Sequence, residues 1–307
     1  MEIVSSPPPL APPTSEGTRL AWLRLLRSRR VGTATFYRLM DEHDGDAGAA
    51  LEALPKVAAA AGMSRYTACS RAQAEQELEA GHRAGARPLF IGAPDYPVAL
   101  LDLADAPPKL WAVGDSSLAQ RPALAMVGAR NASSLGRRAA ATLARGLGES
   151  GLVIVSGLAR GIDGVAHKGA LETGTIAVVA GGVDIIYPRE NAELTTQIAE
   201  QGMILSEMPP GMRPQARHFP RRNRIVSGLA SAVIVVEAAV RSGSLITARD
   251  ALDQGREVLA MPGHALDARA AGCNMLIRDG ATLVRGVDDV LEAIGPLGST
   301  RHETTAS

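Results

Sequence analysis

Two short turns carry residue types that bind phosphate groups, and each follows a run of apolar residues. The first turn reads VGARNAS and the second SGLARG. Glycine lets the backbone approach a ligand closely, while free N–H groups at a helix start and serine hydroxyls favour an anion. The candidate residues are Gly128, Arg130 and Ser133 in the first turn and Ser156, Gly157 and Arg160 in the second. We predict that the turns lie side by side and bind two phosphate groups.

A third turn of this kind follows residues 232–236 and contains Ser242, Gly243 and Ser244. Helix capping alone would account for one serine there, but three Gly/Ser turns after three strands exceed what capping requires. Carboxylates also stand at or just past predicted strand ends, where they could hold a ribose or act as acid and base. These carboxylates are Asp163, Glu207 and Glu237. They keep an enzyme hypothesis open.

Two stretches are rich in arginine and lack any acidic residue. The first lies between Asp115 and Glu149 and the second between Glu207 and Glu237. The second contains HFPRRNR, with Arg217 just before it and Phe219, Arg221, Arg222, Asn223 and Arg224 within it. An aromatic ring among arginines suits single-stranded nucleic acid, because arginines follow the phosphates and a ring stacks on any base. Alternatively, Phe219 is a core residue at a helix end.

The elements that must position these residues form a strand–helix–strand unit. Residues 124–127 and 152–155 are apolar runs, and the alanine-rich segment between them repeats Leu135, Ala139, Leu143 and Leu147 as one apolar stripe. Such a unit predicts two parallel neighbouring strands. Further strands are expected at residues 87–92, 109–114, 175–180, 203–205, 232–236, 257–260 and 282–284. Their apolar runs do not alternate, which predicts a doubly wound, mostly parallel sheet that binds ligands beyond its carboxyl ends.

The pattern divides the 307 residues into four parts. Residues 1–16 are rich in proline and serine and are predicted to be disordered. Residues 17–84 are predicted to form a small all-α domain, residues 85–295 the α/β domain, and residues 296–307 a polar tail. A basic run in the helical part is either a solvated helix face or a DNA contact. It comprises Arg24, Arg27, Arg29 and Arg30.

Several chemistries lack their motifs. None of the three lysines follows a glycine, so there is no GxxxxGK[ST] loop. The turn after residues 124–127 has no GxGxxG, and HExxH and GxSxG are absent. Cys69 and Cys273 stand far apart without a CxxC pair, and the histidines are isolated, so we predict no metal and no cofactor. The charges of the 32 basic and 32 acidic residues cancel, so a polyanion would have to bind at a local basic patch. No signal peptide or membrane span is expected, which favours the cytoplasm.

The motifs resemble the DNA-processing protein A family (DprA, also called Smf). The matching stretches include DYP, VGAR, SGLARGIDGVAHKGAL, GGVDIIYPREN, FPRRNRIVSGLA, SGSLITA, QGREVLAMPG and GCNMLIRDGA, in family order from residue 95 to residue 281. Residues 19–54 are similar, more weakly, to the family's small N-terminal helical domain of the SAM or helix-hairpin-helix type. The resemblance implies an extended Rossmann-like fold.

The resemblance also implies a function. Members are expected to be cytosolic homodimers that bind single-stranded DNA without sequence preference, protect incoming DNA in natural transformation and load the RecA recombinase. By position, the DNA pocket would use the first two turns and residues 219–224. Two features depart from the family pattern: Ala129 replaces an expected serine or threonine, and the chain ends in a polar tail where many members have a winged-helix-like domain.

The dimer contact is predicted in residues 272–283. Met275, Leu276 and Ile277 fall on a short helix and Leu283 follows it. A self-complementary apolar patch suits an isologous pair, although ordinary packing on the sheet would explain the same residues. Two other functions stay open: a nucleotide-processing enzyme, such as a nucleoside-monophosphate N-glycosidase using Glu207 or Glu237, and a nucleotide-sensing module. The enzyme's GGxGTxxE motif is absent, which disfavours the first.

Overall fold

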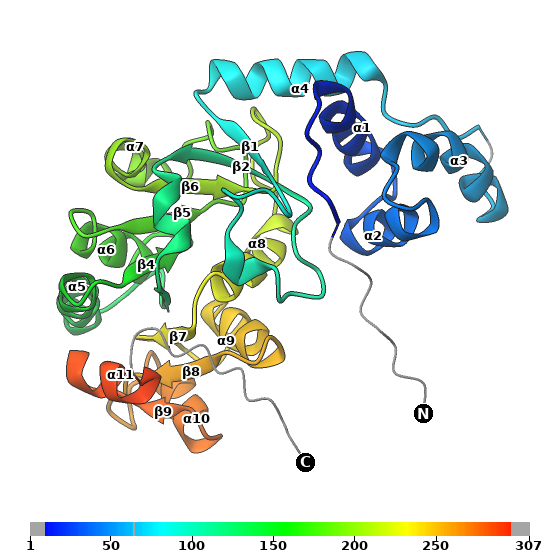
Figure 1. Cartoon of the computed structure of the whole chain (residues 1–307). Coiled ribbons are helices and arrows are strands. Elements are labelled where there is room, and N and C mark those ends of the chain that lie inside the picture. Colours follow the sequence, from blue (N-terminus) through cyan, green and yellow to red (C-terminus); the bar gives the residue numbers. More distant parts are fainter. Residues whose placement is uncertain (1–9, 64, 296–307) are drawn as a thin grey trace.

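A computed structural model describes residues 10–63 and 65–295. Four helices at the amino-terminal end are followed by one nine-stranded sheet with helices on both faces (Figure 1). The strands are β1 (Arg87–Phe90), β2 (Lys109–Gly114), β3 (Ala123–Val127), β4 (Val153–Ser156), β5 (Thr175–Val178), β6 (Met203–Ser206), β7 (Ala232–Val235), β8 (Glu257–Ala260) and β9 (Thr282–Leu283). Every strand expected from the apolar runs is present.

The sheet order is β1-β2-β6-β5-β4-β3-β7-β8-β9. Pairing is parallel from β6 to β9, while β2 pairs antiparallel with both β1 and β6. The chain therefore moves outward from β3 to β6, crosses back, and continues from β7 on the other side of β3. This reversal between β3 and β7 is the switch point at which doubly wound sheets commonly bind ligands. The predicted fold class is confirmed.

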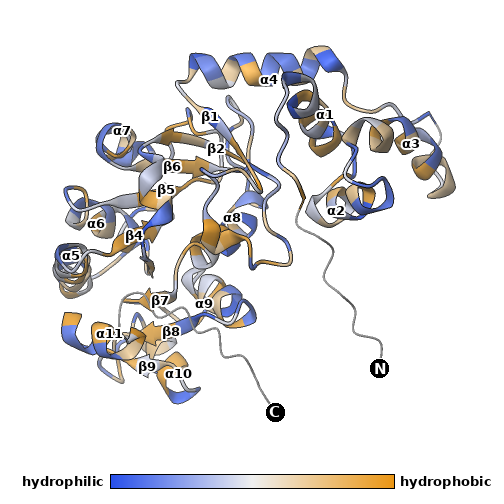
Figure 2. Cartoon of the chain, viewed as in Figure 1, coloured by the Kyte–Doolittle hydropathy of each residue, from blue (hydrophilic) through white to orange (hydrophobic). Residues whose placement is uncertain are grey.

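Successive residues of each central strand enter different cores. Ala125 and Val127 pack with the helices of one face, and Leu124 and Met126 pack with those of the other. Helices α8 (His218–Gly228), α9 (Ser244–Asp253) and α10 (Ala271–Arg278) cover the first face. Helices α5 (Ser134–Glu149), α6 (Ile162–Gly169), α7 (Ala192–Gln201) and α11 (Val287–Ile294) cover the second. The short helices are η1 (Val98–Leu100), η2 (Ser116–Gln120) and η3 (Arg189–Asn191). Figure 2 shows the resulting apolar strands between helices with polar outer faces.

The apolar stripe predicted for α5 begins at the wrong residue. Leu135 is 70% exposed, and the buried face is formed by Gly136, Ala140, Leu143 and Leu147. A strict spacing of four residues overshoots one helical turn by about 40°, so three such steps carry a residue to a different face. The spacings of four, three and four from Gly136 to Leu147 hold one face instead.

The helical part consists of α1 (Glu16–Arg27), α2 (Thr33–Glu42), α3 (Ala47–Ala60) and α4 (Arg71–Arg83). The core of these helices includes one residue of the sheet, Phe90 of β1. The ring of Trp22 packs edge-on against the ring of Phe36, with centroids 5.2 Å apart, and against the ring of Phe90, with centroids 6.0 Å apart. In the predicted basic run, Arg24 and Arg27 are half-buried and bonded within the protein, whereas Arg29 and Arg30 are exposed.

Residues 10–16 are packed and capped, contrary to the prediction for this segment. Residues 10–16 lie within the segment expected to be disordered, yet Leu10 packs on the helical core, Pro13 is buried and Ser15 caps α1. Apolar contacts and a cap offset the entropy lost by ordering this segment. Residues 1–9 and the tail predicted at 296–307 lie outside the described residues.

An ionic cluster joins α4 to the sheet. Glu77 accepts hydrogen bonds from Arg27 at 2.6 Å, from Lys109 Nζ at 3.2 Å and from Trp111 Nε1 at 3.0 Å. Burial alone would raise the pKa of Glu77, but the charges of Lys109 and Arg27 lower it to about 2. Gly81 lets the helix approach closely, since a Cβ there would overlap the Trp111 ring. The two predicted domains therefore pack through a shared, fully hydrogen-bonded carboxylate.

Candidate functional site

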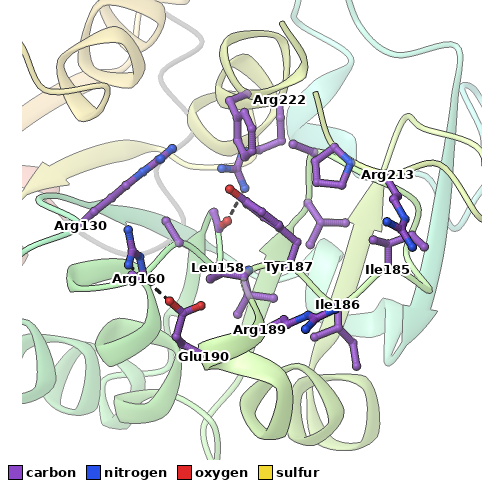
Figure 3. Close-up of a pocket in the computed structure, with 18 of the residues that line it drawn as sticks. Arg130, Leu158, Arg160, Ile185, Ile186, Tyr187, Arg189, Glu190, Arg213 and Arg222 are labelled. Atoms are coloured by element: carbon purple, nitrogen blue, oxygen red, sulfur yellow. Dashed lines mark hydrogen bonds and ion pairs between the residues drawn. The ribbon is translucent and has the colours of Figure 1, made fainter. Parts of the chain in front are cut away.

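The principal cavity opens beyond the carboxyl ends of β4 and β5 and has a volume of about 800 Å³ (Figure 3). Its walls come from the turn after β4 (residues 157–160), the long segment after β5 (residues 179–190), the loop before α8, and α8 itself. Arg130 reaches it from the turn after β3. The cavity is thus at the predicted edge of the sheet, but displaced from the switch point between β3 and β7.

Cations outnumber carboxylates in this cavity. Among the described residues, Arg130, Arg189 and Arg213 make no ion pair. Arg160 pairs with Glu190 at 3.3 Å on the exposed rim. Figure 3 shows Arg130 and Arg160 on one side of the space and Arg213 on the other. Several guanidinium groups around one cavity, with few carboxylates to balance them, raise the local concentration of a polyanion.

One wall of the cavity is aromatic. Phe219, at the start of α8, is half-buried, and the guanidinium carbon of Arg130 lies 5.5 Å from its ring centre. The ring of Tyr187 lies 5.6 Å from the Phe219 ring, tilted by 49°. Tyr187 and its neighbour Ile186 are each almost half exposed. The ring of Phe219 therefore borders the cavity and does not belong to the core.

The arginines of HFPRRNR, which we predicted to contact phosphates, have different environments. Because α8 is helical, these residues point around its circumference. Arg222 is buried and donates to the carbonyl oxygens of Gly157 and Val178. Arg224 is engaged by Glu207 at 2.5 Å and by Asp105 at 3.1 Å. Arg217 and Arg221 are exposed and Asn223 is half-buried, and all three lie outside the cavity lining.

At the switch point, the first predicted anion-binding turn is occupied by the protein's own carboxylate. Glu237 accepts a hydrogen bond from the backbone N–H of Ser133 at 3.0 Å and from its hydroxyl at 2.5 Å. Ser133 also caps α5 by accepting from the N–H of Gly136 at 2.9 Å. A Cβ at Gly136 would press against the Glu237 carboxylate. The helix terminus is therefore satisfied internally.

The second and third turns are also satisfied internally. The Ser156 hydroxyl is buried and donates to the Met126 carbonyl at 2.6 Å. The Asp163 carboxylate accepts from the N–H groups of Gly157 and Ala159 at 3.2 and 3.4 Å. In the third turn, Ser242 and Ser244 bond to each other at 2.6 Å at the start of α9, and Gly243 is the N-cap of that helix. In the first turn, Gly128 packs against Ile162. Of the six residues in the first two turns, Arg130, Gly157 and Arg160 line the cavity.

The residues of the cavity that we did not predict come from the segment after β5 and the loop before α8. They are Tyr187, Arg189 and Arg213, with Ile185 and Ile186 beside them. A signal was present in the sequence, since GGVDIIYPREN places exposed apolar and aromatic residues directly after a strand. Glu207 and Glu237, the candidate acid or base residues, do not line this cavity.

The predicted dimer residues differ in their exposure. Leu276 and Ile277 pack partly against the sheet core and Met275 is half-buried, as the packing alternative expected. Leu283 is 44% exposed on β9, the edge strand. Within the described residues, no cluster of three metal-ligating side chains occurs. In the same part of the chain, no helix combines the length and apolarity needed to cross a membrane.

The fold and the cavity together define a doubly wound α/β protein with an arginine-rich, aromatic-walled ligand site. Residues 87–295 match the family described as DNA recombination-mediator protein A, and residues 16–80 match the DprA-like N-terminal HHH domain. The chain therefore belongs to the DprA family, which confirms the resemblance drawn from its motifs.

Known relatives agree with this membership. The DNA processing protein DprA of Streptococcus pneumoniae is 47% identical over 198 residues, covering 64% of this chain and 70% of that protein. DprA of Bacillus subtilis is 43% identical over 220 residues, covering 71% and 74%. The X-ray structure of the S. pneumoniae protein superposes with a TM-score of 0.73 at 35% identity, covering 90% of this chain and 96% of that one. A Helicobacter pylori DprA structure, described by its single-stranded DNA binding mode, gives 0.63 at 33% identity, with coverages of 68% and 95%.

Proposed function

We propose that this protein binds single-stranded DNA without sequence preference and does so in the cavity beyond β4 and β5. The observation that carries the proposal is the combination of the Phe219–Tyr187 wall with three arginines that make no ion pair within the described part of the chain. Arginines there suit the phosphates and the aromatic wall suits the bases, a pairing typical of sequence-tolerant single-strand binding. The single-stranded DNA binding mode described for the H. pylori relative supports this assignment.

The proposal is one of binding without catalysis. Glu237 is committed to capping α5 and Glu207 to Arg224, so neither faces the cavity as a free acid or base. Asp163 is buried beneath the turn after β4, where it accepts two backbone hydrogen bonds.

Two carboxylates line the cavity, and each is bonded within the protein: Asp184 accepts from the N–H of Gly211 at 2.8 Å, and Glu190 pairs with Arg160 at 3.3 Å. A nucleotide-processing enzyme would need a carboxylate free to reach its substrate.

The wider role that we propose follows from family membership. The protein would act in the cytoplasm as a homodimer, protect incoming single strands during natural transformation and load RecA onto them. For the dimer, Leu283 on the exposed edge of the sheet, together with Met275, Leu276 and Ile277, remains the proposed contact. An isologous contact at a sheet edge buries the same residues from both copies.

A binding assay with three ligands tests the central proposal. The ligands are a single-stranded oligonucleotide, the duplex of the same sequence and a mononucleotide, each measured at about 50 and 200 mM salt. We expect the single strand to bind most tightly and its affinity to fall with salt. Equal or tighter binding of the mononucleotide would favour a nucleotide-sensing module. Release of a base or phosphate would favour an enzyme.

The wider role is tested separately. Light scattering at micromolar concentration should give the mass of a dimer, and Leu283→Arg should give a monomer that still melts cooperatively. RecA filaments should form faster on single strands in the presence of the wild-type protein. A monomeric wild type, or RecA assembly unaffected by the protein, would contradict these parts of the proposal while leaving DNA binding intact.

A further inference from the structure

Helix α8 contributes two residues to the cavity, and they have different environments. Phe219 borders the open space, whereas Arg222, one helical turn later, is only 7% exposed and lies beneath it. The guanidinium of Arg222 donates to the carbonyl of Gly157, just after β4, and to the carbonyl of Val178, at the end of β5. Arg222 therefore ties α8 to the ends of two neighbouring strands.

The same turn is held from a second direction. The N–H groups of Gly157 and Ala159 both donate to Asp163 on α6. Burial raises the pKa of Asp163, and the nearby charge of Arg222 opposes that rise. Asp163 thus holds two N–H groups of the segment 157–159, and Arg222 holds the first carbonyl of the same segment.

The packing leaves little freedom between Arg222 and this turn. A Cβ at Gly157 would overlap the Arg222 guanidinium, so the guanidinium lies directly on the backbone. The segment that follows β4 also contacts the turn that carries Arg130, because the N–H of Ile162 donates to the Ala129 carbonyl at 3.2 Å. A Cβ at Gly161 would overlap that same carbonyl. Contacts therefore run without a break from α8 through residues 157–162 to residues 129–130.

The burial of Arg222 is not optimised for stability. Its Nε has no hydrogen-bond partner among the described residues. Burial lowers the pKa of Arg222 to about 10, while the charge of Asp163 opposes that effect. A buried charged group with an unsatisfied donor is costly, and such costs are retained most often where geometry serves function.

We propose that Arg222 is a positioning residue for the DNA site: it does not contact DNA but sets the spacing between Phe219 on α8 and the turns that carry Arg130 and Arg160. The inference rests on the proposed function of the cavity. Both bonds come from one terminal nitrogen, Nη1, which the rigid planar guanidinium holds against the Gly157 backbone. The ammonium of lysine is a smaller group on a flexible stem, and it cannot reproduce this packing. Phosphate binding is less demanding, since lysine binds phosphate well as a point charge. Arg222→Lys therefore separates the two roles.

The experiment measures single-strand affinity against salt for the wild type, Arg222→Lys and Arg221→Lys. The control makes the same change one residue earlier, on an exposed side chain outside the cavity. We expect Arg222→Lys to weaken binding roughly 2–30-fold, the range found for residues that act through a network. The slope of log K against log salt should stay unchanged, and Arg221→Lys should match the wild type.

A second measurement does not require DNA. Hydrogen exchange of the free protein should show faster exchange at residues 157–161 in Arg222→Lys, with residues elsewhere in the sheet unaffected. Wild-type affinity in folded Arg222→Lys would overturn the positioning role, whether Arg222 contacts phosphate or serves stability alone. Unchanged exchange at residues 157–161 would also overturn it. A wild-type protein that binds no single strand would instead refute the proposed function, and the exchange result would still test how the turn is held.

Discussion

The switch point between β3 and β7 and the cavity beyond β4 and β5 make an instructive comparison. Both regions have glycine-containing turns, serine residues and nearby arginines at the carboxyl edge of the same sheet. At the switch point, Glu237 accepts from the N–H and the hydroxyl of Ser133 and so occupies the helix terminus. In the cavity, Arg130, Arg189 and Arg213 have no ion pairs among the described residues.

The difference lies in where the protein supplies its own anion. A Gly/Ser turn satisfied by an internal carboxylate stabilises the fold, and the N–H and hydroxyl of Ser133 are no longer available to a ligand. In the cavity, five arginines face two carboxylates, and three of the arginines make no ion pair among the described residues (Figure 3). Their charge is uncompensated, and a bound polyanion would neutralise it. The distribution of partners, more than the residue types in a turn, separates the binding region from the structural one.

The largest effect should follow from removing a cavity arginine. Arg130→Ala should weaken single-strand binding roughly 10–100-fold, because a hydrogen bond to a charged group contributes about 1.5–3 kcal/mol. The salt slope of log K should also decrease by about 0.7 for one lost phosphate contact. Isothermal titration at several salt concentrations measures both. Arg137→Ala, an exposed arginine of α5 outside the cavity, is the matched control, and equal losses in the two variants would contradict a localised site.

The aromatic wall should contribute almost as much but without salt dependence. Phe219→Ala should cost roughly 1–3 kcal/mol of binding free energy, the range for one base–aromatic stack, with the salt slope retained. Because Arg130 lies over the same ring at 5.5 Å, the two substitutions should not be additive. A double-mutant cycle of Arg130→Ala and Phe219→Ala measures that coupling. Full affinity in Phe219→Ala, with an unchanged melting curve, would show that the ring has no role in binding.

Sequence patterns predicted the sheet better than the site. Strands buried on both faces, such as β3 and β4, are continuous apolar runs, and such runs can be recognised without knowing which strands lie beside them. The partners of an arginine cannot be read in this way. Arg222 and Arg224 are two residues apart, yet Arg222 bonds to β5 and to the turn after β4, while Arg224 pairs with Glu207 and Asp105. Which arginines remain free is decided by contacts between residues distant in the chain.

Contacts between residues distant in the chain also decide the roles of the serines and the position of the aromatic wall, and neither could be predicted from the sequence. Nothing near Ser133 in sequence indicates that Glu237, 104 residues later, fills its turn. Tyr187 lies in a segment recognised only as a family motif, and its position beside Phe219 depends on how the loop after β5 meets α8. The Gly/Ser turns were therefore found correctly as local structures, although most of their hydroxyls are used internally.

A pH experiment tests whether the contact between α6 and the amino end of β5 is closed to solvent, as the turn at the switch point is closed to a ligand. Burial lowers the pKa of His167 to about 3, and its Nδ1 lies 2.7 Å from the Thr175 hydroxyl. Below the unfolded pKa of 6.5 the unfolded chain binds a proton that the folded protein does not, so the free energy of unfolding falls as pH falls. His167→Asn should remove about 1.4 kcal/mol per pH unit of that dependence between about pH 6 and pH 5. Chemical denaturation at each pH gives the slopes, and parallel slopes for the two proteins would mean that His167 is accessible to solvent protons.

The smallest effect should come from the switch point, and it should fall on stability alone. Ser133→Ala removes the N-cap of α5 and one donor to Glu237, so we expect a loss of roughly 0.5–2 kcal/mol in the free energy of unfolding. Single-strand affinity and its salt slope should match the wild type, because the hydroxyl is already committed to Glu237. Arg130, three residues earlier in the same turn, should show the opposite pattern, with weakened binding and nearly unchanged stability. If Ser133→Ala instead lowers affinity in a protein of wild-type stability, DNA displaces Glu237 from the helix terminus, and the switch point is part of the binding site after all.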